Sequence, residues 1–395
     1  MWRHIASNAL TFFIVALFLL GGLITWGANQ YSAAGPLAQA ICLRVEAGSN
    51  MRTVGAELTA QGAVSSGTIF GIGADYSGKA AALKAGSFLV PEAASMEQIV
   101  DIVTRGGAST CGTEVVYRIG IARVLVEVRQ LDAATNRFIE VAKFEPEVEP
   151  TPPEYTDVRA KADTRFRIAL AEGVTSWQVM TELNGLDVLE GDVTEVPPEG
   201  SLAPNSYEVV PGTQVTDVLA QMTTAQAAVL AELWAERAED LPVATPEEAL
   251  ILASLIEKET GVPEERAQVA SVFVNRLRQG MKLQTDPAVI YGVTNGQGLL
   301  GRGLRASELR AVTPYNTYVI DGLPPTPIAN PGRDAIAAAL NPATTDFVFF
   351  VADGTGGHAF ANNLDDHNAN VARWREIEAR QAAEAAANGT VPEGQ

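Results

Sequence analysis

The chain has 395 residues and carries 28 Lys and Arg against 47 Asp and Glu, which gives a formal charge of −19. This acidic balance argues against nucleic-acid binding, which requires basic side chains to neutralise phosphates. A hydrophobic content of 47 % excludes a disordered chain, and the length allows two or three domains. The three histidines, His4, His358 and His367, have no zinc-ligand spacing, so we expect no metal and no other cofactor.

The amino terminus holds an almost unbroken apolar run from Leu10 to Trp26, which with its flanks is long enough to span a bilayer. Arg3 precedes the run and the next positive charge is Arg44, so the positive-inside rule leaves the amino terminus in the cytoplasm. We expect a single-pass anchor in the inner (cytoplasmic) membrane, with lipid around this run and the rest of the chain in the periplasm. A cleaved signal peptide, with a small-residue site ending at Ala40, is the alternative.

Residues 29–112 form a small segment that contains both cysteines. An apolar–polar alternation predicts a strand at 41–45, and helical spacing follows at 51–60. A second strand is expected at 86–91 and a second helix at 95–104. Because an even cysteine count in an oxidising compartment favours pairing, we expect a Cys42–Cys111 disulfide; two unrelated thiols are the alternative.

Residues 113–160 are predicted to be a β-hairpin insertion and a linker. The hairpin arms are expected at 115–128 and 137–144, and the acidic, Pro-rich stretch 145–154 is expected to be too stiff and polar to pack. Residues 161–240 are predicted to be a second small α+β module, with a strand near 167, a helix at 176–183, a strand at 207–211 and a helix at 215–237. This order weakly repeats the first module, and chance similarity is the alternative.

Residues 241–395 carry the strongest helix signal. Thr245 is an N-cap, Pro246 fits the first turn and Glu248 fits the capping-box position, and the helix is expected to run to Glu259. Glu259 shares the apolar stripe of Leu252, Leu255 and Ile256, whereas Glu257 and Lys258 are expected on a solvated face.

A carboxyl on a buried stripe is unfavourable unless it is paired or used. Burial raises a carboxyl pKa, which is what a general acid near neutral pH requires. The alternative for Glu259 is an ion pair with Arg266 or Arg276 of the next helix, expected at 264–279. After it, Thr285 or Asp286 is expected to cap a short helix that begins at Pro287.

Three later features complete the domain. The loop at 313–318 places two tyrosines beside an amide, a combination that suits sugar rings, although such residues are also common in plain packing. A buried strand at 347–351 and a return strand at 358–360 predict a hairpin that carries His358, which would orient a substrate, act as a base or be structural. After the hairpin, residues 365–367 are expected to cap a helix, and a carboxyl-terminal helix is expected from Trp374. The segment 266–310 holds seven basic and two acidic groups, a local +5 that would suit a substrate with carboxylates; ordinary surface patterning is the alternative.

The sequence runs LASLIEKETG, ERAQVASVFVNRLRQGMKLQTDPAVIYG, TPYNTY, GLPPTPIANPG and FVADGTGGHAFANNLDDHN resemble the MltG/YceG family of endolytic murein transglycosylases. The resemblance covers about a third of the chain. It implies an α+β fold with a single transmembrane helix in 1–28, a LysM-like small α+β module in 29–112 and a second small α+β module in 161–240. A mixed α/β catalytic domain with a carboxyl-terminal helix is implied for 241–395.

The resemblance also implies an activity and a site. The family cleaves the MurNAc–GlcNAc β-1,4 bond of nascent peptidoglycan strands and leaves 1,6-anhydro-MurNAc ends, with one Glu acting as acid and then as base. Glu259 matches that catalytic residue. Glycan strands are then the substrate, and peptidoglycan synthases are the implied protein partners. Asn275 and Arg276 would support the cleft, and the implied glycan-contacting residues are Gln284, Tyr315, Asn316, Tyr318 and His358.

Two other functions are compatible with the sequence. A muramidase-type hydrolase would use two carboxylates, Glu259 and Asp286, and would leave reducing ends. A non-catalytic peptidoglycan-binding scaffold would bind glycan without turnover.

Overall fold

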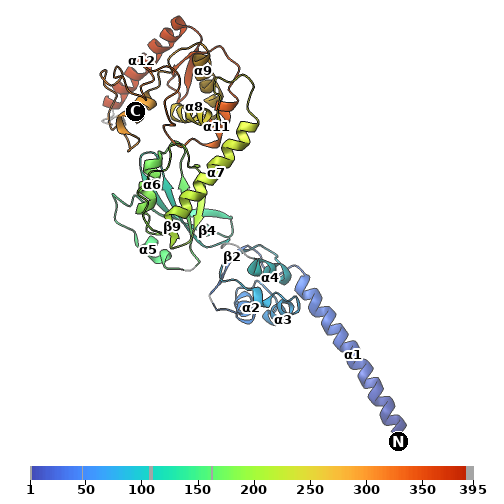
Figure 1. Cartoon of the computed structure of the whole chain (residues 1–395). Helices are drawn as coiled ribbons and strands as arrows, with labels where there is room; N and C mark the ends of the chain where they lie inside the picture. The colour runs from blue at the N-terminus through green and yellow to red at the C-terminus, as the bar shows by residue number, and fades with distance from the viewer. Residues whose placement is uncertain (1, 47, 106–109, 162, 388–395) are drawn as a thin grey trace. The chain divides into compact units, whose positions relative to one another are not determined.

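The computed structural model describes residues 2–46, 48–105, 110–161 and 163–387 and shows a mixed α/β protein (Figure 1). Its internal contacts divide the chain into two compact units, which are described separately here. The first unit comprises Met1–Val116 and Val126–Phe166, and the second comprises Tyr117–Leu125 and Arg167–Gln395. Glu259 and all the other candidate site residues therefore belong to the second unit.

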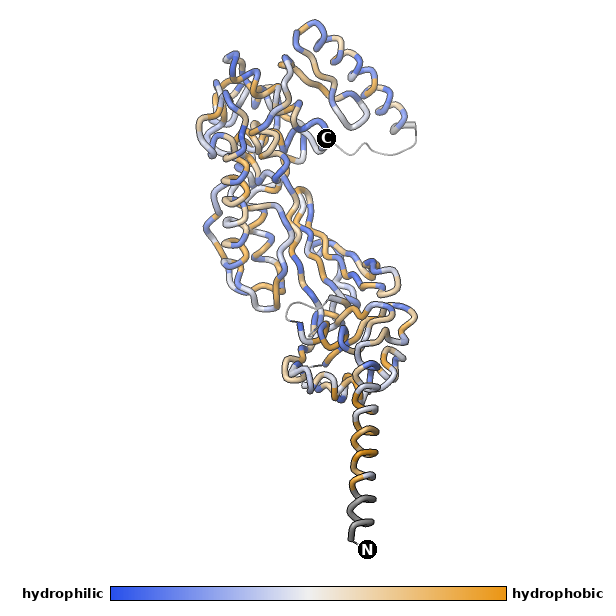
Figure 2. Tube along the Cα trace, turned by 90° about the vertical axis from the view of Figure 1, so that its right-hand side faces the viewer, coloured by the Kyte–Doolittle hydropathy of each residue, from blue (hydrophilic) through white to orange (hydrophobic). Residues whose placement is uncertain are grey.

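The first unit begins with the long helix α1 (Trp2–Ser32). Its stretch Leu10–Ser32 is long and apolar enough to cross a membrane and is not buried by protein, and Figure 2 shows its hydrophobic character. This confirms the predicted apolar span. Its length and composition fit both a membrane anchor and a signal sequence. The end of α1 is packed, because Tyr31 contacts the core of the module that follows and a Cβ on Gly73 would collide with the Tyr31 ring.

The module after α1 is built on one antiparallel strand pair, in which Cys42 lies opposite Leu89. Both strands and two of its helices occur where the sequence predicts them. The sequence did not predict the third helix, because three glycines within it lower its helix propensity. Gly67 of that helix packs directly against Gly55, where neither position has room for a Cβ. The elements are β1 (Ile41–Val45), α2 (Met51–Ala60), α3 (Gly67–Tyr76), β2 (Gly86–Val90) and α4 (Met96–Thr104).

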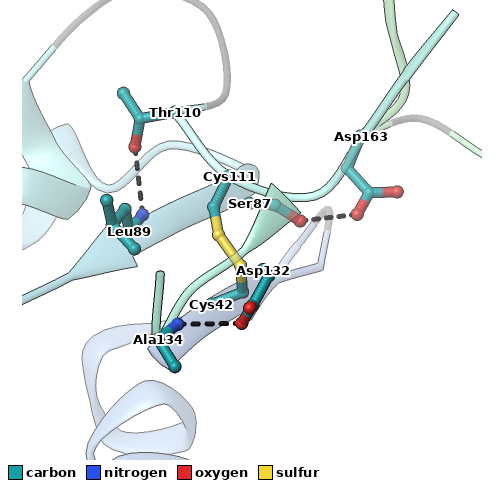
Figure 3. Close-up of a disulfide and its surroundings, with 8 residues drawn as sticks. All are labelled: Cys42, Ser87, Leu89, Thr110, Cys111, Asp132, Ala134 and Asp163. Atoms are coloured by element: carbon teal, nitrogen blue, oxygen red, sulfur yellow. Dashed lines mark hydrogen bonds between the residues drawn. A yellow bond between two sulfur atoms is a disulfide. The ribbon is translucent and has the colours of Figure 1, made fainter. Parts of the chain in front are cut away.

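Cys42 and Cys111 form a disulfide, with their Cα atoms 5.7 Å apart (Figure 3). Cys42 lies on β1, and the segment that carries Cys111 runs beside β2, where the Thr110 hydroxyl accepts a hydrogen bond from Leu89 N at 3.0 Å. The predicted pairing is therefore confirmed, and the alternative of two unrelated thiols is wrong.

Replacing both cysteines by Ser should lower the free energy of unfolding of the first unit by about 4 kcal/mol, because the cross-link restricts the unfolded chain. The bond joins residues 69 positions apart, which makes this restriction large. Urea unfolding should show the same lowered midpoint for the double variant and for reduced wild type. The transition of the second unit is the internal control, and an unchanged first transition after reduction would contradict the prediction.

A five-stranded sheet has the strand order β5-β4-β3-β6-β8. The predicted long arm at 115–128 is wrong, because it is two strands joined by a tight turn in which Gly120 N donates to Arg123 O at 3.1 Å. The second arm is confirmed. The strands are β3 (Thr113–Ile119), β4 (Val124–Asp132), β5 (Arg137–Phe144), β6 (Arg165–Leu170) and β8 (Ser206–Val209).

The acidic linker is shorter than predicted. Helix α5 (Pro153–Arg159) begins at the last proline of the stretch and buries Tyr155 and Val158. The Tyr155 ring packs edge-on against Phe144 at a centroid distance of 5.4 Å. The predicted stretch therefore ends in the first turn of a helix, with which Pro153 is compatible, and the residues that pack lie after it.

The four elements predicted at 161–240 occur in the predicted order, strand, helix, strand and helix. The first module differs in having two helices between its paired strands β1 and β2, whereas a single helix of the second segment lies between β6 and β8. What the two segments share is a capping box, Ser95 with Gln98 in α4 and Thr175 with Gln178 in the second segment. The further elements are α6 (Ser176–Gly185), β7 (Leu189–Glu190), β9 (Thr213–Gln214) and α7 (Val215–Ala235).

Three helices, α8 (Pro246–Glu259), α9 (Arg266–Arg278) and α11 (Arg333–Leu340), form the centre of the carboxyl-terminal region (Figure 1). Their apolar faces meet in one core that includes Leu252, Phe273 and Ile336. A short 3₁₀ helix, η2 (Pro263–Glu265), and α10 (Asp286–Thr294) border this core.

The predicted hairpin is confirmed as β10 (Phe349–Ala352) and β11 (His358–Ala361), paired antiparallel. The last helix, α12 (Leu364–Ala387), begins ten residues earlier than predicted. Asn363 Oδ1 accepts a hydrogen bond from Asp366 N at 2.9 Å, so Asn363 caps the helix and residues 365–367 lie inside it.

Candidate active site

Local chemistry explains why α8 begins where it does. The Thr245 hydroxyl accepts a hydrogen bond from Glu248 N at 3.2 Å, and a Glu248 carboxylate oxygen accepts one from Ala244 N at 2.6 Å. Pro246 occupies the first turn, where its missing N–H has no cost. The helix ends at Glu259, with Thr260 as its C-cap.

Glu259 is the last residue of α8 and its side chain is partly buried. Burial raises the pKa of the Glu259 carboxyl, and the nearby negative charge of Asp286 raises it further. A carboxylate at a helix carboxyl terminus is also disfavoured by the helix dipole. The Thr285 side chain and the electrostatic interactions with His358 and Arg276 oppose this shift in the pKa without reversing it. The carboxyl therefore keeps its proton to a higher pH than an ordinary glutamate.

The groups that interact with Glu259 come from four separate segments. Thr285 and Asp286 lie at the start of α10, Arg276 lies on α9 and His358 begins β11. Tyr318, from the loop after α10, also interacts with the Glu259 charge, and burial raises the pKa of its phenol. The structure therefore brings three sequence-predicted residues, Glu259, Tyr318 and His358, into one cluster.

Asp286 is the second carboxylate of this cluster. It lies within the first turn of α10, and Thr285, the other predicted candidate, is the N-cap residue, although its side chain makes no cap hydrogen bond. Asp286 Oδ1 instead accepts a hydrogen bond from the Tyr318 hydroxyl at 2.7 Å. The preceding residue, Gln284, is exposed and has a left-handed backbone with φ of 52°. Its N–H donates to Thr317 O at 3.1 Å, which fixes the exposed side chain beside the cluster.

Tyr315 and Asn316 have structural contacts. The Tyr315 hydroxyl is hydrogen-bonded to Thr326 Oγ1 at 2.8 Å, and its ring packs on Tyr291 at a centroid distance of 5.0 Å. Asn316 is completely buried. We therefore assign Asn316 a loop-positioning role in place of the expected glycan contact. Its side-chain amide Nδ2 donates to the carbonyl oxygens of Glu308, Leu309 and Ala311, and its Oδ1 accepts from Tyr318 N.

Asn275 and Arg276 hold the hairpin against α9. Asn275 Nδ2 donates to Phe347 O at 2.9 Å, and Arg276 Nε donates to Val348 O at 2.6 Å. Arg276 also donates through Nη1 to Leu283 O at 2.6 Å, just before the Gln284–Asp286 segment. These contacts agree with the expected supporting role.

Glu257 and Lys258 are not on a solvated face, and that prediction is wrong. The Glu257 side chain is only 5 % exposed, and its carboxylate accepts a hydrogen bond from Gly332 N at 2.9 Å. Lys258 Nζ donates to Gly173 O at 3.2 Å. Segments distant in the sequence cover this side of the helix, so burial raises the pKa of Glu257 and lowers that of Lys258.

The predicted ion-pair alternative for Glu259 is also wrong for Arg266. That guanidinium lies 3.4 Å from Glu172, 3.6 Å from Asp334 and 4.0 Å from Glu257. Much of the local +5 is therefore internal, because Arg266 and Arg276 are buried. Arg302 pairs with Glu308 at 2.6 Å and Lys282 pairs with Asp321 at 2.7 Å. Among the described residues, the exposed cations of this segment without an ion pair are therefore Arg278, Arg305 and Arg310.

No sequence pattern pointed to Glu265, whose carboxylate contacts His358. Glu265 ends η2, and its carboxylate lies 2.8 Å from His358 Nδ1. No spacing pattern could connect residues 93 positions apart. Within the described part of the chain, no three His, Cys, Asp or Glu side chains are grouped closely enough to bind a metal ion.

Comparison with known proteins gives several relatives. The endolytic murein transglycosylase of Streptococcus pneumoniae (strain D39) is 29 % identical over 345 residues, which is 84 % of this chain and 58 % of that protein. The endolytic murein transglycosylase of Bacillus subtilis (strain 168) is 37 % identical over 173 residues, 44 % of this chain and 46 % of that protein. The chain thus spans about half the length of these curated relatives.

A crystal structure of a YceG-like protein from Listeria monocytogenes is 24 % identical, with a TM-score of 0.40, and the match covers 84 % of this chain and 98 % of that one. The model of the YceG-like family matches residues 43–373, which is most of the chain from β1 into α12. The chain therefore belongs to the YceG-like family.

Proposed function

We propose that this protein is a peptidoglycan lytic transglycosylase that cuts the MurNAc–GlcNAc β-1,4 bond within glycan strands and leaves 1,6-anhydro-MurNAc ends. The observation that carries the proposal is the position of Glu259 at the end of α8, in one cluster with Asp286, Tyr318 and His358, where burial raises the pKa of its carboxyl. Two relatives with the name endolytic murein transglycosylase support the same reaction class.

In the proposed mechanism Glu259 acts twice. Its protonated carboxyl first donates a proton to the glycosidic oxygen, so that the bond between that oxygen and C1 of MurNAc breaks and the GlcNAc hydroxyl leaves. The resulting carboxylate then takes the proton of the MurNAc C6 hydroxyl as O6 bonds to C1 and closes the 1,6-anhydro ring. Glu259 ends protonated, as it began. Because the nucleophile belongs to the substrate, one carboxyl is sufficient.

The glycan-contacting residues in this proposal are Gln284, Tyr318 and His358. Gln284 is exposed. His358 interacts with the charge of Glu259, and Tyr318 interacts with the charges of Glu259 and Asp286. Tyr315 is partly exposed and presents the edge of a packed aromatic pair. The contacts of Tyr318 with Asp286 and of His358 with Glu265 hold both side chains in defined positions, as glycan orientation requires.

Asp286 supports a second candidate, a two-carboxylate hydrolase. Its charge raises the pKa of Glu259, which shows that the two carboxyls interact. In such an enzyme Asp286 would activate a water or attack C1, and the product would carry a reducing end. We favour the single-carboxyl reaction because Asp286 Oδ1 already accepts a hydrogen bond from the Tyr318 hydroxyl, so this carboxylate serves to hold the tyrosine.

We also propose that α1 is an uncleaved anchor, with the folded units on the periplasmic side. Cleavage after Ala40 would cut immediately before β1, and the residues just before this site are part of the folded module. Leu37 is buried and its carbonyl oxygen accepts a hydrogen bond from Ala93 N at 2.9 Å. Tyr31 packs on the same module. An anchor that continues directly into a folded module would hold the enzyme close to the membrane.

The test of turnover uses the full chain in detergent and uncrosslinked glycan strands. Chromatography of strand lengths over time should show a rapid fall in mean length with few disaccharides released, since internal cuts shorten strands without trimming their ends. Strands that bind to the protein but keep their length would support the scaffold alternative and contradict the proposal.

A further inference from the structure

A single carboxylate, that of Glu265, holds both the backbone and the ring of His358. Its Oε1 accepts a hydrogen bond from His358 N at 2.9 Å, and its Oε2 lies 2.8 Å from His358 Nδ1. The His358 and Glu265 side chains are only 15 % and 17 % exposed. The contact ties the first residue of β11 to η2, just after α8 and Glu259.

The surroundings of this pair leave the His358 ring little freedom. A Cβ on Gly357 would collide with Glu265 Oε1, so the glycine gives the carboxylate its room. The Phe350 ring meets the His358 ring edge to face, at a centroid distance of 5.2 Å and an angle of 85°. The ring is thus fixed at Nδ1 and on one side, and it interacts with the charge of Glu259.

We propose that Glu265 is a positioning residue that fixes the orientation and the tautomer of His358, so that Nε2 is the ring nitrogen left for the glycan and the Glu259 carboxyl. An ionised carboxylate only accepts hydrogen bonds, so Nδ1 must carry a proton. In the neutral ring Nε2 is then an acceptor. The inference rests on the proposed function, because it gives His358 a part in the reaction at Glu259.

A purely structural role for Glu265 would explain the contact to His358 N equally well. The variant Glu265→Gln separates the two roles. Gln keeps an oxygen that can accept from His358 N, but its NH₂ group would donate to Nδ1 and so move the ring proton to Nε2. The hairpin should therefore stay in place while the tautomer changes.

The full chain, labelled with ¹⁵N-histidine in detergent, allows the tautomer to be measured directly. With only His4, His358 and His367 present, a His358→Gln variant identifies the relevant signals. Wild type should show Nδ1 protonated in the neutral ring, and Glu265→Gln should show Nε2 protonated. Turnover of glycan strands by Glu265→Gln should fall about 10²-fold in kcat with little change in KM, the size of effect that a misplaced catalytic contact produces. Glu264→Gln, exposed on the same 3₁₀ turn, is the matched control and should behave as wild type.

A second variant tests whether a folding defect explains the result for Glu265→Gln. Gly357→Ala keeps the carboxylate but displaces it from His358, and it should give the same fall in kcat. Wild-type kcat or an unchanged tautomer in Glu265→Gln would overturn the inference. If wild type itself does not cleave glycan, the proposed function fails, whereas the tautomer measurement still decides whether Glu265 controls the His358 ring.

Discussion

Replacing Glu259 by Gln should reduce turnover of glycan strands by about 10³-fold or more, because an amide can neither donate the proton nor take it back. The variant should fold normally. Initial rates on purified uncrosslinked strands, with the full chain in detergent, measure the effect. Glu264→Gln is the control, since it removes a nearby carboxyl that is exposed.

The stability of Glu259→Gln gives an independent check. The raised pKa of Glu259 means that ionisation of its carboxyl is less favourable in the folded chain than in the unfolded one. Wild type should therefore lose stability, relative to the variant, as pH rises from the ordinary carboxyl pKa through the raised folded value. Thermal unfolding should show Glu259→Gln gaining on wild type between pH 4 and neutrality. A folded Glu259→Gln that keeps turnover within tenfold of wild type would exclude Glu259 as the catalytic acid.

Replacing Asn316 by Ala should lower the free energy of unfolding of the second unit by about 3 kcal/mol, since each lost hydrogen bond contributes about 1 kcal/mol and carbonyls are left unpaired. The Asn316 amide holds three carbonyls of the 308–311 turn, the shortest contact being 2.6 Å to Ala311 O. Turnover should fall as well, because Asn316 also fixes Tyr318 N. Urea unfolding and strand cleavage measure the two effects.

Two further variants make the Asn316 test specific. Asn316→Asp keeps an acceptor for Tyr318 N but turns a carboxylate toward the three carbonyls, so it should destabilise the second unit at least as much as Ala. Val312→Ala, at a side chain 85 % exposed in the same loop, should change neither stability nor turnover. If Asn316→Ala were as stable as wild type, the loop-positioning role of Asn316 would be wrong.

The helix that carries Glu259 was predictable because its signals are local. The cap at Thr245, the proline beside it and the apolar stripe define α8 without any knowledge of the rest of the chain. The same local reasoning predicted that Glu257 and Lys258 face solvent, and this prediction was wrong. Gly332 and Gly173, both more than 70 residues away, cover those side chains. A helical pattern states which residues share a face but not what packs against the other faces.

The site itself was predictable only in part, for the same reason. The resemblance pointed to Glu259, Tyr318 and His358, which the structure brings into one cluster. It did not distinguish Asn316, whose hydrogen bonds all go to its own loop. Glu265 was missed entirely, since its contact with His358 depends on where a hairpin meets α9. Helix α3 was missed for a related reason. Its glycines disfavour a helix by propensity, and the tight packing of Gly67 on Gly55 that stabilises it cannot be seen in the sequence.

The chemistry of the new strand ends tests the central claim most directly. Full-length protein is incubated with uncrosslinked glycan strands, and the released fragments are analysed by mass spectrometry before and after borohydride reduction. A lytic transglycosylase that uses Glu259 alone should give 1,6-anhydro-MurNAc ends, 18 Da lighter than reducing ends by the mass of one water, and borohydride should leave them unchanged. Reducible MurNAc ends in the wild-type products would contradict the account and would indicate a hydrolase in which Asp286 acts with Glu259.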